Sequence, residues 1–365
     1  MNWFFSAFSL ILLLMSSCQT DQSDESIQRK NRFAAGHPHL QFLGKHTLTS
    51  DSAYEFAWTA SQVSGRFRGK SITIFLSATA HNPAVGGPIF RVQVDDQSPR
   101  IWQPSEDPSQ GLVIDSLPEA EHRFRLFLLT EASVGTCQFR GVELPSGGEL
   151  LPWDQAKPLQ IESIGNSITC GYGNLGSHES CDFSPETEDG YQAYSAIAAR
   201  ELNADYQAVC YSGRGVCWNY QRAIPETMAD LYDRVSPDDP SLVWEAGPWS
   251  PDIVTINLGT NDFAHEIPPR AMFVERYLEL ITKVRRYYPE AHIVLLTGSM
   301  MTGQRLRVLQ GYLDEVVNQT PGPVHRFDLT PQGALGYGCN WHPNIAQHQL
   351  NGQELADFLR QILKP

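Results

Sequence analysis

The stretch Leu159-Gln160-Ile161-Glu162-Ser163-Ile164, which continues as Gly165-Asn166-Ser167-Ile168-Thr169, decides the fold of the chain. The first half is short and largely apolar, a pattern typical of a strand buried in a sheet. The second half is made of small and polar residues, a pattern typical of the loop that follows such a strand. Open parallel sheets bind their ligands where the strands end. The stretch therefore predicts the first strand of a parallel sheet and a functional loop directly after it.

Strand-like and helix-like segments alternate from this stretch to the end of the chain. Pro268 and Pro269 precede one expected helix, and Pro289 ends it. The expected strands are residues 159–164, 205–211, 252–258, 292–296 and 324–329, and the expected helices are residues 191–202, 271–288, 305–317 and 345–363. The alternation predicts an α/β domain over residues 159–365, with helices covering both faces of a parallel sheet.

Upstream of this domain the pattern changes to short runs in which apolar and polar residues alternate. Gly, Pro and Asp separate the runs, and residues 94–98 have the composition of a hairpin turn. The clearest expected strands are residues 53–58, 71–76, 89–94 and 122–129. This pattern predicts an all-β sandwich or jelly roll over residues 37–144. Residues 145–158, which are rich in Pro and Gly, are expected to form a linker.

The N-terminus carries an apolar run over residues 3–15, interrupted only by Ser6 and Ser9. A membrane-spanning helix needs roughly 20 apolar residues, so the run fits the apolar part of a signal peptide. Leu14-Met15-Ser16-Ser17-Cys18 resembles a bacterial lipoprotein box, although no Lys or Arg precedes the run. We therefore expect a signal peptide over residues 1–18, lipidation of Cys18 and a flexible tether over residues 19–36.

This N-terminus predicts an exported protein, held at a membrane only by its lipid anchor and facing the periplasm or the cell surface. A plain secretory signal is the alternative. Six further cysteines could pair in an exported chain, and the local candidates are Cys170/Cys181 and Cys210/Cys217. Buried free thiols are the other possibility. The chain has no Cys-x-x-Cys pair, which argues against zinc-ribbon and thioredoxin-like sites.

The net charge of the chain limits the classes of molecule that it is expected to bind. Acidic residues outnumber basic ones, 41 to 27, and the net charge is −14. Nucleic-acid binders usually carry a basic stripe, which this sequence lacks, so no nucleic-acid partner is expected. A polyanionic substrate would be repelled by the overall field, whereas a neutral substrate would not.

Polar loops follow three of the expected strands, and a fourth precedes the last helix. They are residues 165–169, 212–215, 259–262 and 340–344. Acyl transfer needs an exposed hydroxyl, an imidazole that removes its proton, and hydrogen-bond donors for the developing oxyanion. Ser167 can supply the hydroxyl and His342 the imidazole. The N–H groups of Ser167 and Gly213 and the side-chain amide of Asn261 can form the oxyanion hole.

Taken together, these blocks resemble the SGNH hydrolases, the GDS-type esterase superfamily. Gly165-Asn166-Ser167-Ile168-Thr169-Cys170-Gly171-Tyr172-Gly173 and Trp341-His342-Pro343 are similar to segments of carbohydrate esterase family two, which joins a jelly roll to an SGNH domain. The resemblance implies a flavodoxin-like α/β fold and an acetyl xylan esterase-like enzyme with no cofactor and no metal. It also implies acetylated xylan or glucomannan as the substrate, Ser167 as nucleophile and His342 as base.

Two positions depart from the superfamily pattern. Asn166 stands where an Asp usually precedes the nucleophile, and the similar shape of Asn is expected to preserve the turn. Cys339 stands where many SGNH enzymes place an Asp that orients the histidine. Family two is described as often working with a Ser–His dyad whose imidazole is held by a backbone carbonyl, and the missing Asp agrees with that. Asp328 could still lie near His342.

Several other side chains have open roles. Trp341 and Tyr172 are the expected substrate-binding aromatics, because apolar sugar faces stack on rings. His348 is expected on a helix surface, and Asp262 is expected to hold its own loop. Further candidates for the cleft wall are Trp218, Trp244 and Trp249. Two other functions stay open: a surface glycan-binding lipoprotein with an inactive SGNH domain, and an SGNH lipase or thioesterase.

Overall fold

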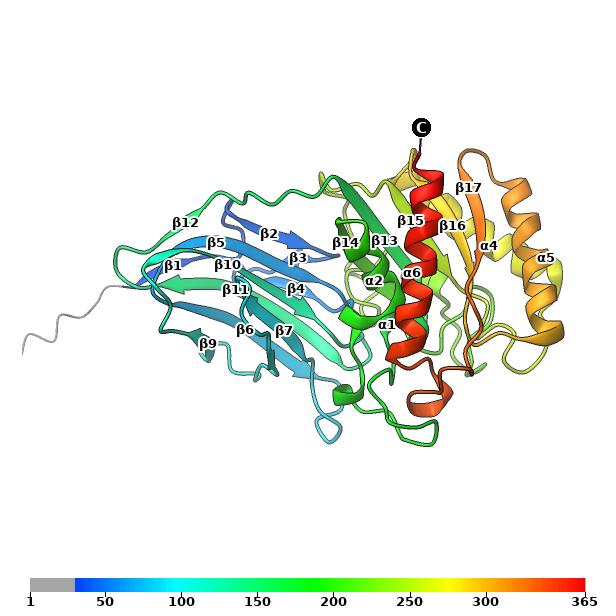
Figure 1. Ribbon diagram of the computed structural model, residues 1–365, viewed down its shortest axis with the longest axis horizontal. Coiled ribbons are helices and arrows are strands. Elements are labelled where there is room, and N and C mark those ends of the chain that lie inside the picture. Colours follow the sequence, from blue (N-terminus) through cyan, green and yellow to red (C-terminus); the bar gives the residue numbers. More distant parts are fainter. Residues whose placement is uncertain (1–29, 365) are drawn as a thin grey trace, which may run out of the picture.

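The computed structural model describes residues 30–364, which form two domains side by side along the long axis (Figure 1). The expected signal peptide, Cys18 and most of the expected tether lie outside the described residues. Within residues 30–364, no helix has the length and the apolar character needed to cross a membrane.

The N-terminal domain is a sandwich of two antiparallel sheets. One sheet has the strand order β3-β4-β11-β6-β9, with β1 paired to β11, and the other has the order β12-β5-β10-β7-β8, with β2 paired to β5. The strands are β1 (Asn31–Phe33), β2 (Leu40–Leu43), β3 (Thr47–Leu48), β4 (Tyr54–Phe56), β5 (Gln62–Gly69), β6 (Ile72–Ala80), β7 (Phe90–Val94), β8 (Arg100–Trp102), β9 (Gly111–Ile114), β10 (Ala120–Leu128), β11 (Gly135–Leu144) and β12 (Glu149–Leu151). Alternate residues such as Phe67, Ile74 and Phe124 fill the space between the sheets.

The predicted all-β sandwich is confirmed, and the predicted turn joins β7 to β8 as a hairpin. Two short strands lie where the sequence predicted irregular segments. Within the expected tether, β1 pairs with β11, and within the expected linker, β12 pairs with β5. Edge pairing stabilises these strands through backbone hydrogen bonds, which composition does not reveal.

The C-terminal domain contains a parallel five-stranded sheet with the order β14-β13-β15-β16-β17, which confirms the predicted α/β fold. Its strands are β13 (Leu159–Gly165), β14 (Ala204–Cys210), β15 (Ile253–Asn257), β16 (His292–Thr297) and β17 (Val324–Asp328). Its helices are α1 (Ser167–Cys170), α2 (Tyr194–Glu201), α3 (Met228–Leu231), α4 (Arg270–Tyr287), α5 (Gly303–Gln319) and α6 (Ile345–Ile362), with 3₁₀ helices η1 (Pro185–Thr187), η2 (Gly190–Gln192) and η3 (Cys339–Trp341).

Helices α2 and α6 cover one face of this sheet, and α4 and α5 cover the other (Figure 1). One expected helix, residues 191–202, is divided in the structure. Asp189 accepts the backbone N–H groups of Tyr191 and Gln192, which makes the short turn η2, and α2 begins only after Ala193. The order of the strands places the loops after β13, β14 and β15 at one edge of the sheet.

The two domains contact each other through partly buried hydrogen bonds. The indole N–H of Trp58, in the β domain, donates to the carbonyl of Arg234 at 3.0 Å. The amide of Gln62 donates to the carbonyl of Tyr206 at 2.6 Å. Trp58 also packs in the same apolar cluster as Ile164, next to the loop after β13. The β domain therefore supports the edge of the sheet at which the polar loops meet.

Candidate active site

Ser167 lies on a tight turn between β13 and α1. Asn166 precedes it with an extended backbone, and the side-chain oxygen of Asn166 accepts the N–H of Ile168 at 3.1 Å. Asn therefore supplies the cap at this position, as its similarity in shape to Asp predicts. A Cβ on Gly165 would come within 2.0 Å of the Thr169 hydroxyl oxygen, so only glycine allows the turn to close this tightly.

The imidazole of His342 contacts the hydroxyl of Ser167. The distance from His342 Nε2 to Ser167 Oγ is 2.9 Å. On the other side of the ring, Nδ1 lies 3.0 Å from the carbonyl oxygen of Asn340. A carbonyl only accepts, so Nδ1 carries the hydrogen and Nε2 is free to accept the proton of Ser167.

The group that holds the imidazole is thus a backbone carbonyl. Asp328 points elsewhere, since it pairs with Arg326 at 3.4 Å and accepts from Gln310 at 2.9 Å. Its possible place beside His342 is therefore excluded. A carbonyl orients the ring and fixes its tautomer, but unlike a carboxylate it adds no full negative charge beside the imidazolium.

The expected oxyanion donors line the same cleft as Ser167 and His342, a cavity of about 920 Å³. Gly213 has a φ of +77°, a conformation that favours glycine, and no atom lies within 4 Å of the position a Cβ would take. The side-chain nitrogen of Asn261 donates one hydrogen to the carbonyl of Arg214 at 2.8 Å. Its second hydrogen remains available, so the amide can serve an oxyanion.

Burial lowers the pKa of His342 to about 4, although the backbone groups of Asn340 and Cys339 act in the opposite direction. The imidazole is therefore neutral at ordinary pH, the form in which it can accept a proton. Charge on the ring appears only when the pH falls through this value.

We expect kcat/KM for an aryl acetate to stay constant from neutral pH down to about pH 5 and to fall as the pH drops through about 4, because only the neutral imidazole is a base. A pH–rate profile, with activity checked again after return to pH 7, measures this. An acidic limb centred near the ordinary value of 6.5 would contradict the expectation.

A disulfide between Cys181 and Cys339 ties the His342 loop to the loop before η1. Cys339 N–H also donates to the carbonyl of Gly173 at 2.9 Å. The local pairs Cys170/Cys181 and Cys210/Cys217 are therefore wrong, and Cys137, Cys170, Cys210 and Cys217 are free thiols in the structure. The segment around Cys181 folds back over the histidine loop, and spacing along the chain does not show such a return.

We expect the double variant Cys181→Ser/Cys339→Ser to lower the melting temperature and kcat together. Loss of a native disulfide typically costs about 2–5 kcal/mol, and a displacement of about 1 Å at a catalytic group can cost about 10²-fold in rate. Thermal unfolding and aryl acetate kinetics measure both effects. Cys137→Ser, at a free thiol inside the β sandwich, is the matched control for activity. Unchanged kcat in the double variant would show that the disulfide does not position His342.

Trp341 and Tyr172 both line the cleft. Trp341 is 56% exposed, which is unusual for a tryptophan and leaves its ring free to contact a ligand. Tyr172 stacks on Phe183 with 4.2 Å between ring centroids and lies 4.4 Å from the His342 ring. Its hydroxyl accepts a hydrogen bond from Asn340 at 3.1 Å, so Tyr172 supports the histidine loop as well as the cleft wall.

Other expectations about this region are wrong. Trp244 is buried in the core, Trp249 packs near Tyr288, and Trp218 lies under Arg222; none of these three tryptophans lines the cleft. His348 is 1% exposed rather than on a helix surface. Its Nδ1 accepts the backbone N–H of Tyr194 at 3.1 Å, because this face of α6 packs on α2.

Asp262 is structural, and it holds the neighbouring loop. One carboxylate oxygen accepts the backbone N–H groups of Cys217 at 2.8 Å, Trp218 at 2.9 Å and Val216 at 3.0 Å. The expectation that it would hold its own loop is therefore wrong. It organises the segment that follows Gly213, one of the expected oxyanion donors.

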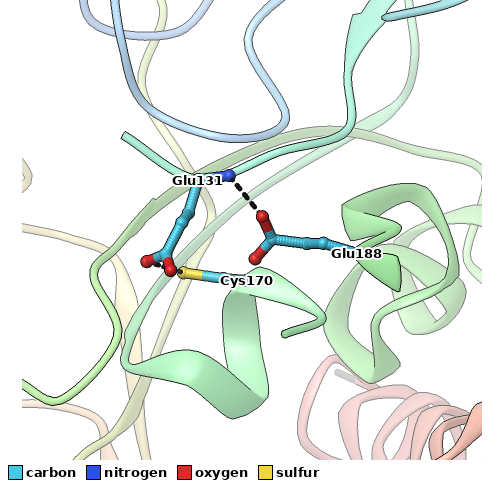
Figure 2. A group of neighbouring side chains, drawn as sticks. All are labelled: Glu131, Cys170 and Glu188. Atoms are coloured by element: carbon cyan, nitrogen blue, oxygen red, sulfur yellow. Dashed lines mark hydrogen bonds between the residues drawn. The ribbon is translucent and has the colours of Figure 1, made fainter. Parts of the chain in front are cut away.

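Sequence reasoning did not single out Glu131 or Glu188. These two buried carboxyl groups and the thiol of Cys170 form the one cluster of possible metal-binding side chains in residues 30–364, with donor atoms within 4.8 Å of one another (Figure 2). Buried acidic residues far apart in sequence carry no local pattern, so nothing in the sequence marks them.

The fold and the Ser167–His342 contact define a serine hydrolase of the SGNH type. Residues 163–350 match the GDSL-like Lipase/Acylhydrolase family, and residues 42–153 match the carbohydrate esterase 2 N-terminal domain. The chain therefore belongs to the GDSL-like lipase/acylhydrolase family, with the two domains of the family two carbohydrate esterases, and is a carboxylic ester hydrolase.

Named relatives and a solved structure agree with this assignment. The chain is 34% identical over 331 residues to the cellulase/esterase CelE of Acetivibrio thermocellus, covering 89% of this chain but only 40% of that protein. It is 27% identical to an acetylxylan esterase/glucomannan deacetylase of Cellvibrio japonicus, covering 85% and 86% of the two chains. The solved structure of a family two carbohydrate esterase from Clostridium thermocellum in complex with cellohexaose is 32% identical, with a TM-score of 0.79, covering 89% and 99%.

Proposed function

We propose that the protein removes O-acetyl groups from plant polysaccharides such as xylan or glucomannan. The observation that carries the proposal is the 2.9 Å contact between Ser167 Oγ and His342 Nε2, in a cleft beside the exposed ring of Trp341. Two relatives from Cellvibrio japonicus are each named acetylxylan esterase/glucomannan deacetylase, and these names support the acetyl ester and the polysaccharide.

In the proposed mechanism, His342 Nε2 takes the hydroxyl proton as Ser167 Oγ bonds to the acetyl carbonyl carbon. The negative charge on the carbonyl oxygen is stabilised by the N–H groups of Ser167 and Gly213 and by the amide of Asn261. The imidazolium then protonates the departing sugar oxygen as its bond to the acetyl carbon breaks. Water, deprotonated by the same imidazole, attacks the acetyl-serine and releases acetate. The serine regains its proton from His342.

Charge and shape favour a neutral sugar polymer. With a net charge of −14, the protein does not attract polyanions at long range. Trp341 offers a flat apolar ring at the edge of the cleft, and sugar rings present apolar C–H faces that stack on such rings. A polymer can thus bind by stacking while a single acetyl group reaches Ser167.

The test is acetate release from acetylated xylan and acetylated glucomannan by the wild type and by Ser167→Ala. Release by the wild type alone supports the proposal. Binding of either polymer without acetate release would favour the alternative of a glycan-binding protein. Faster hydrolysis of octanoyl than of acetyl aryl esters would favour a lipase or a thioesterase.

Export and lipidation at Cys18 are part of the same proposal. The apolar run, the lipoprotein-like box and the Cys181–Cys339 disulfide, a bond that persists in oxidising compartments, support them. Labelling of the full chain with a fatty acid in a bacterial host, compared with Cys18→Ala, tests the anchor. Equal labelling of both chains, or labelling of neither, would contradict it.

A further inference from the structure

A carboxyl group of the β domain lies beneath the loop that carries Gly213. Glu131 follows β10 and is 2% exposed. Its Oε2 accepts the backbone N–H of Ser212, the residue before Gly213, at 2.7 Å. We propose that Glu131 is a positioning residue of the esterase, holding the Ser212–Gly213 segment so that the N–H of Gly213 faces the oxyanion. The inference rests on the proposed role of Gly213 in the oxyanion hole.

The same carboxyl group also contacts the nucleophile turn. Cys170, the last residue of α1, places its sulfur 3.7 Å from Glu131 Oε2 (Figure 2). Cys170 Sγ in turn lies 2.7 Å from the sulfur of Cys210, at the end of β14. One side chain of the β domain is therefore in contact with both the turn that begins at Ser167 and the loop that contains Gly213.

Glu131 is itself held firmly. Its backbone N–H donates to Glu188 Oε2 at 2.9 Å, and Glu188 is 1% exposed (Figure 2). Two residues earlier, the carbonyl of Leu129 accepts the backbone N–H of Gly190 at 2.9 Å. The loop after β10 is thus bonded at two points to the segment before α2, so its carboxyl group has a defined position relative to the cleft.

The Ser212–Gly213 segment, which Glu131 holds, needs a contact that fixes its conformation. Gly213 has a positive φ and open space around it, and a glycine in open space can adopt other conformations at little cost. The carbonyl of Gly213 accepts the N–H of Tyr220 at 2.8 Å on one side. On the other side, the Ser212–Glu131 hydrogen bond holds the residue that enters Gly213. The neighbouring backbone bonds, from Tyr211 N–H to the Gly165 carbonyl and from Arg214 N–H to the Tyr211 carbonyl, are both longer, at 3.3 Å.

In this role, Glu131 must accept a hydrogen bond, but it does not need to carry a negative charge. Neither Glu131 nor Glu188 takes part in an ion pair among residues 30–364. Burial raises the pKa of both carboxyl groups, and the proximity of Glu131 raises that of Glu188 further. A glutamine has the same length and one acceptor oxygen, so it can replace Glu131 as the acceptor of the Ser212 N–H. Its amide could donate to Glu188 Oε1, which has no hydrogen-bond partner.

The variants Glu131→Gln and Glu131→Asp test the inference as a matched pair. Glu131→Gln keeps the side-chain length and an acceptor oxygen but removes the carboxyl group. Glu131→Asp keeps the carboxyl group but shortens the side chain by one methylene, which moves the acceptor oxygen away from the Ser212 N–H. Removal of a whole oxyanion donor costs about 10²–10³-fold in kcat, so a misplaced Gly213 is expected to cost about 10–100-fold. We expect this loss in kcat for Glu131→Asp, with KM for an aryl acetate within about twofold of wild type, and kcat within about threefold of wild type for Glu131→Gln.

A second readout separates positioning from stability. A boronic acid that forms a tetrahedral adduct with Ser167 is expected to bind Glu131→Asp about 10-fold or more weakly than Glu131→Gln. Thr130→Val is the control, because Thr130 is equally buried in the same loop but its hydroxyl accepts from Ile89 rather than from Ser212. All assays are run well below the melting temperature of each variant. We expect Thr130→Val to retain the kcat of the wild type.

Equal kcat and equal boronate affinity for Glu131→Asp and wild type would overturn the inference, as would equal losses in both Glu131 variants. Failure of both variants to fold would also overturn it, since the role would then be one in stability. The polysaccharide substrate is tested separately. If the wild type cleaves aryl acetate but releases no acetate from xylan or glucomannan, the proposed substrate is excluded. The inference about Glu131 is then unaffected, because it is tested with aryl acetate and the boronic acid.

Discussion

Ser167→Ala is expected to lower kcat for an aryl acetate by at least about 10⁴-fold, because the variant lacks the oxygen that would bond to the acetyl carbon. The Ser167 hydroxyl is the group that the structure places 2.9 Å from the imidazole. Removal of a nucleophile of this kind leaves only the contribution of binding and of the oxyanion donors. Steady-state kinetics with aryl acetate and acetate release from acetylated xylan both measure the effect.

The variant should keep its fold, because Ser167 Oγ has no role in capping the turn; Asn166 does that. Ser195→Ala is the matched control. Ser195 is a buried serine in α2 whose hydroxyl bonds to that of Tyr206 at 2.7 Å, away from the cleft. We expect it to lose stability rather than kcat. Ser167→Ala with more than about a tenth of wild-type kcat would exclude Ser167 as nucleophile.

His342→Ala is expected to lower kcat by about 10³–10⁴-fold, the upper part of the range of about 10²–10⁴-fold that a positioned general base contributes. Among the described residues, no other histidine lines the cleft that contains Ser167. His348, the nearest in sequence, is buried and has its Nδ1 occupied by the N–H of Tyr194. Kinetics on aryl acetate at neutral pH measures the loss.

Two comparisons sharpen the test of His342. His325→Gln, at a half-buried histidine that stacks on His292, is expected to retain kcat. The double variant Ser167→Ala/His342→Ala is expected to be no slower than the slower single variant, because the two groups act as a unit. Losses that multiply in the double variant would mean that Ser167 and His342 act independently.

Much of the fold could be predicted from the sequence, because its signals are local. The alternation of apolar and polar residues in 71–76 and 122–129 is retained in β6 and β10, and the prolines around 271–288 mark the ends of α4 within a residue. Short edge strands such as β1 and β12 were missed, because their pairing energy comes from a distant partner rather than from their own residues.

The candidate site could likewise be predicted from the sequence only in part. The sequence predicted which residues could come together, since Ser167, Gly213 and Asn261 follow successive strands and parallel strands end at one edge. It also predicted that a carbonyl could replace the missing Asp, through the resemblance, but not that the carbonyl belongs to Asn340. The buried positions of Trp244 and His348 were not visible, because burial depends on which face of an element meets its neighbour.

By itself, the sequence determined the two-domain architecture and the residue types available for acyl transfer, since periodicity and loop composition act over a few neighbouring residues. Three features were decided by the tertiary structure alone. They are the disulfide between Cys181 and Cys339, the exposure of the Trp341 side chain to solvent, and the hydrogen bond between Glu131 and Ser212. Each of these joins or exposes segments through the packing of parts far apart in the chain. Such contacts depend on distances in space, which no local pattern records.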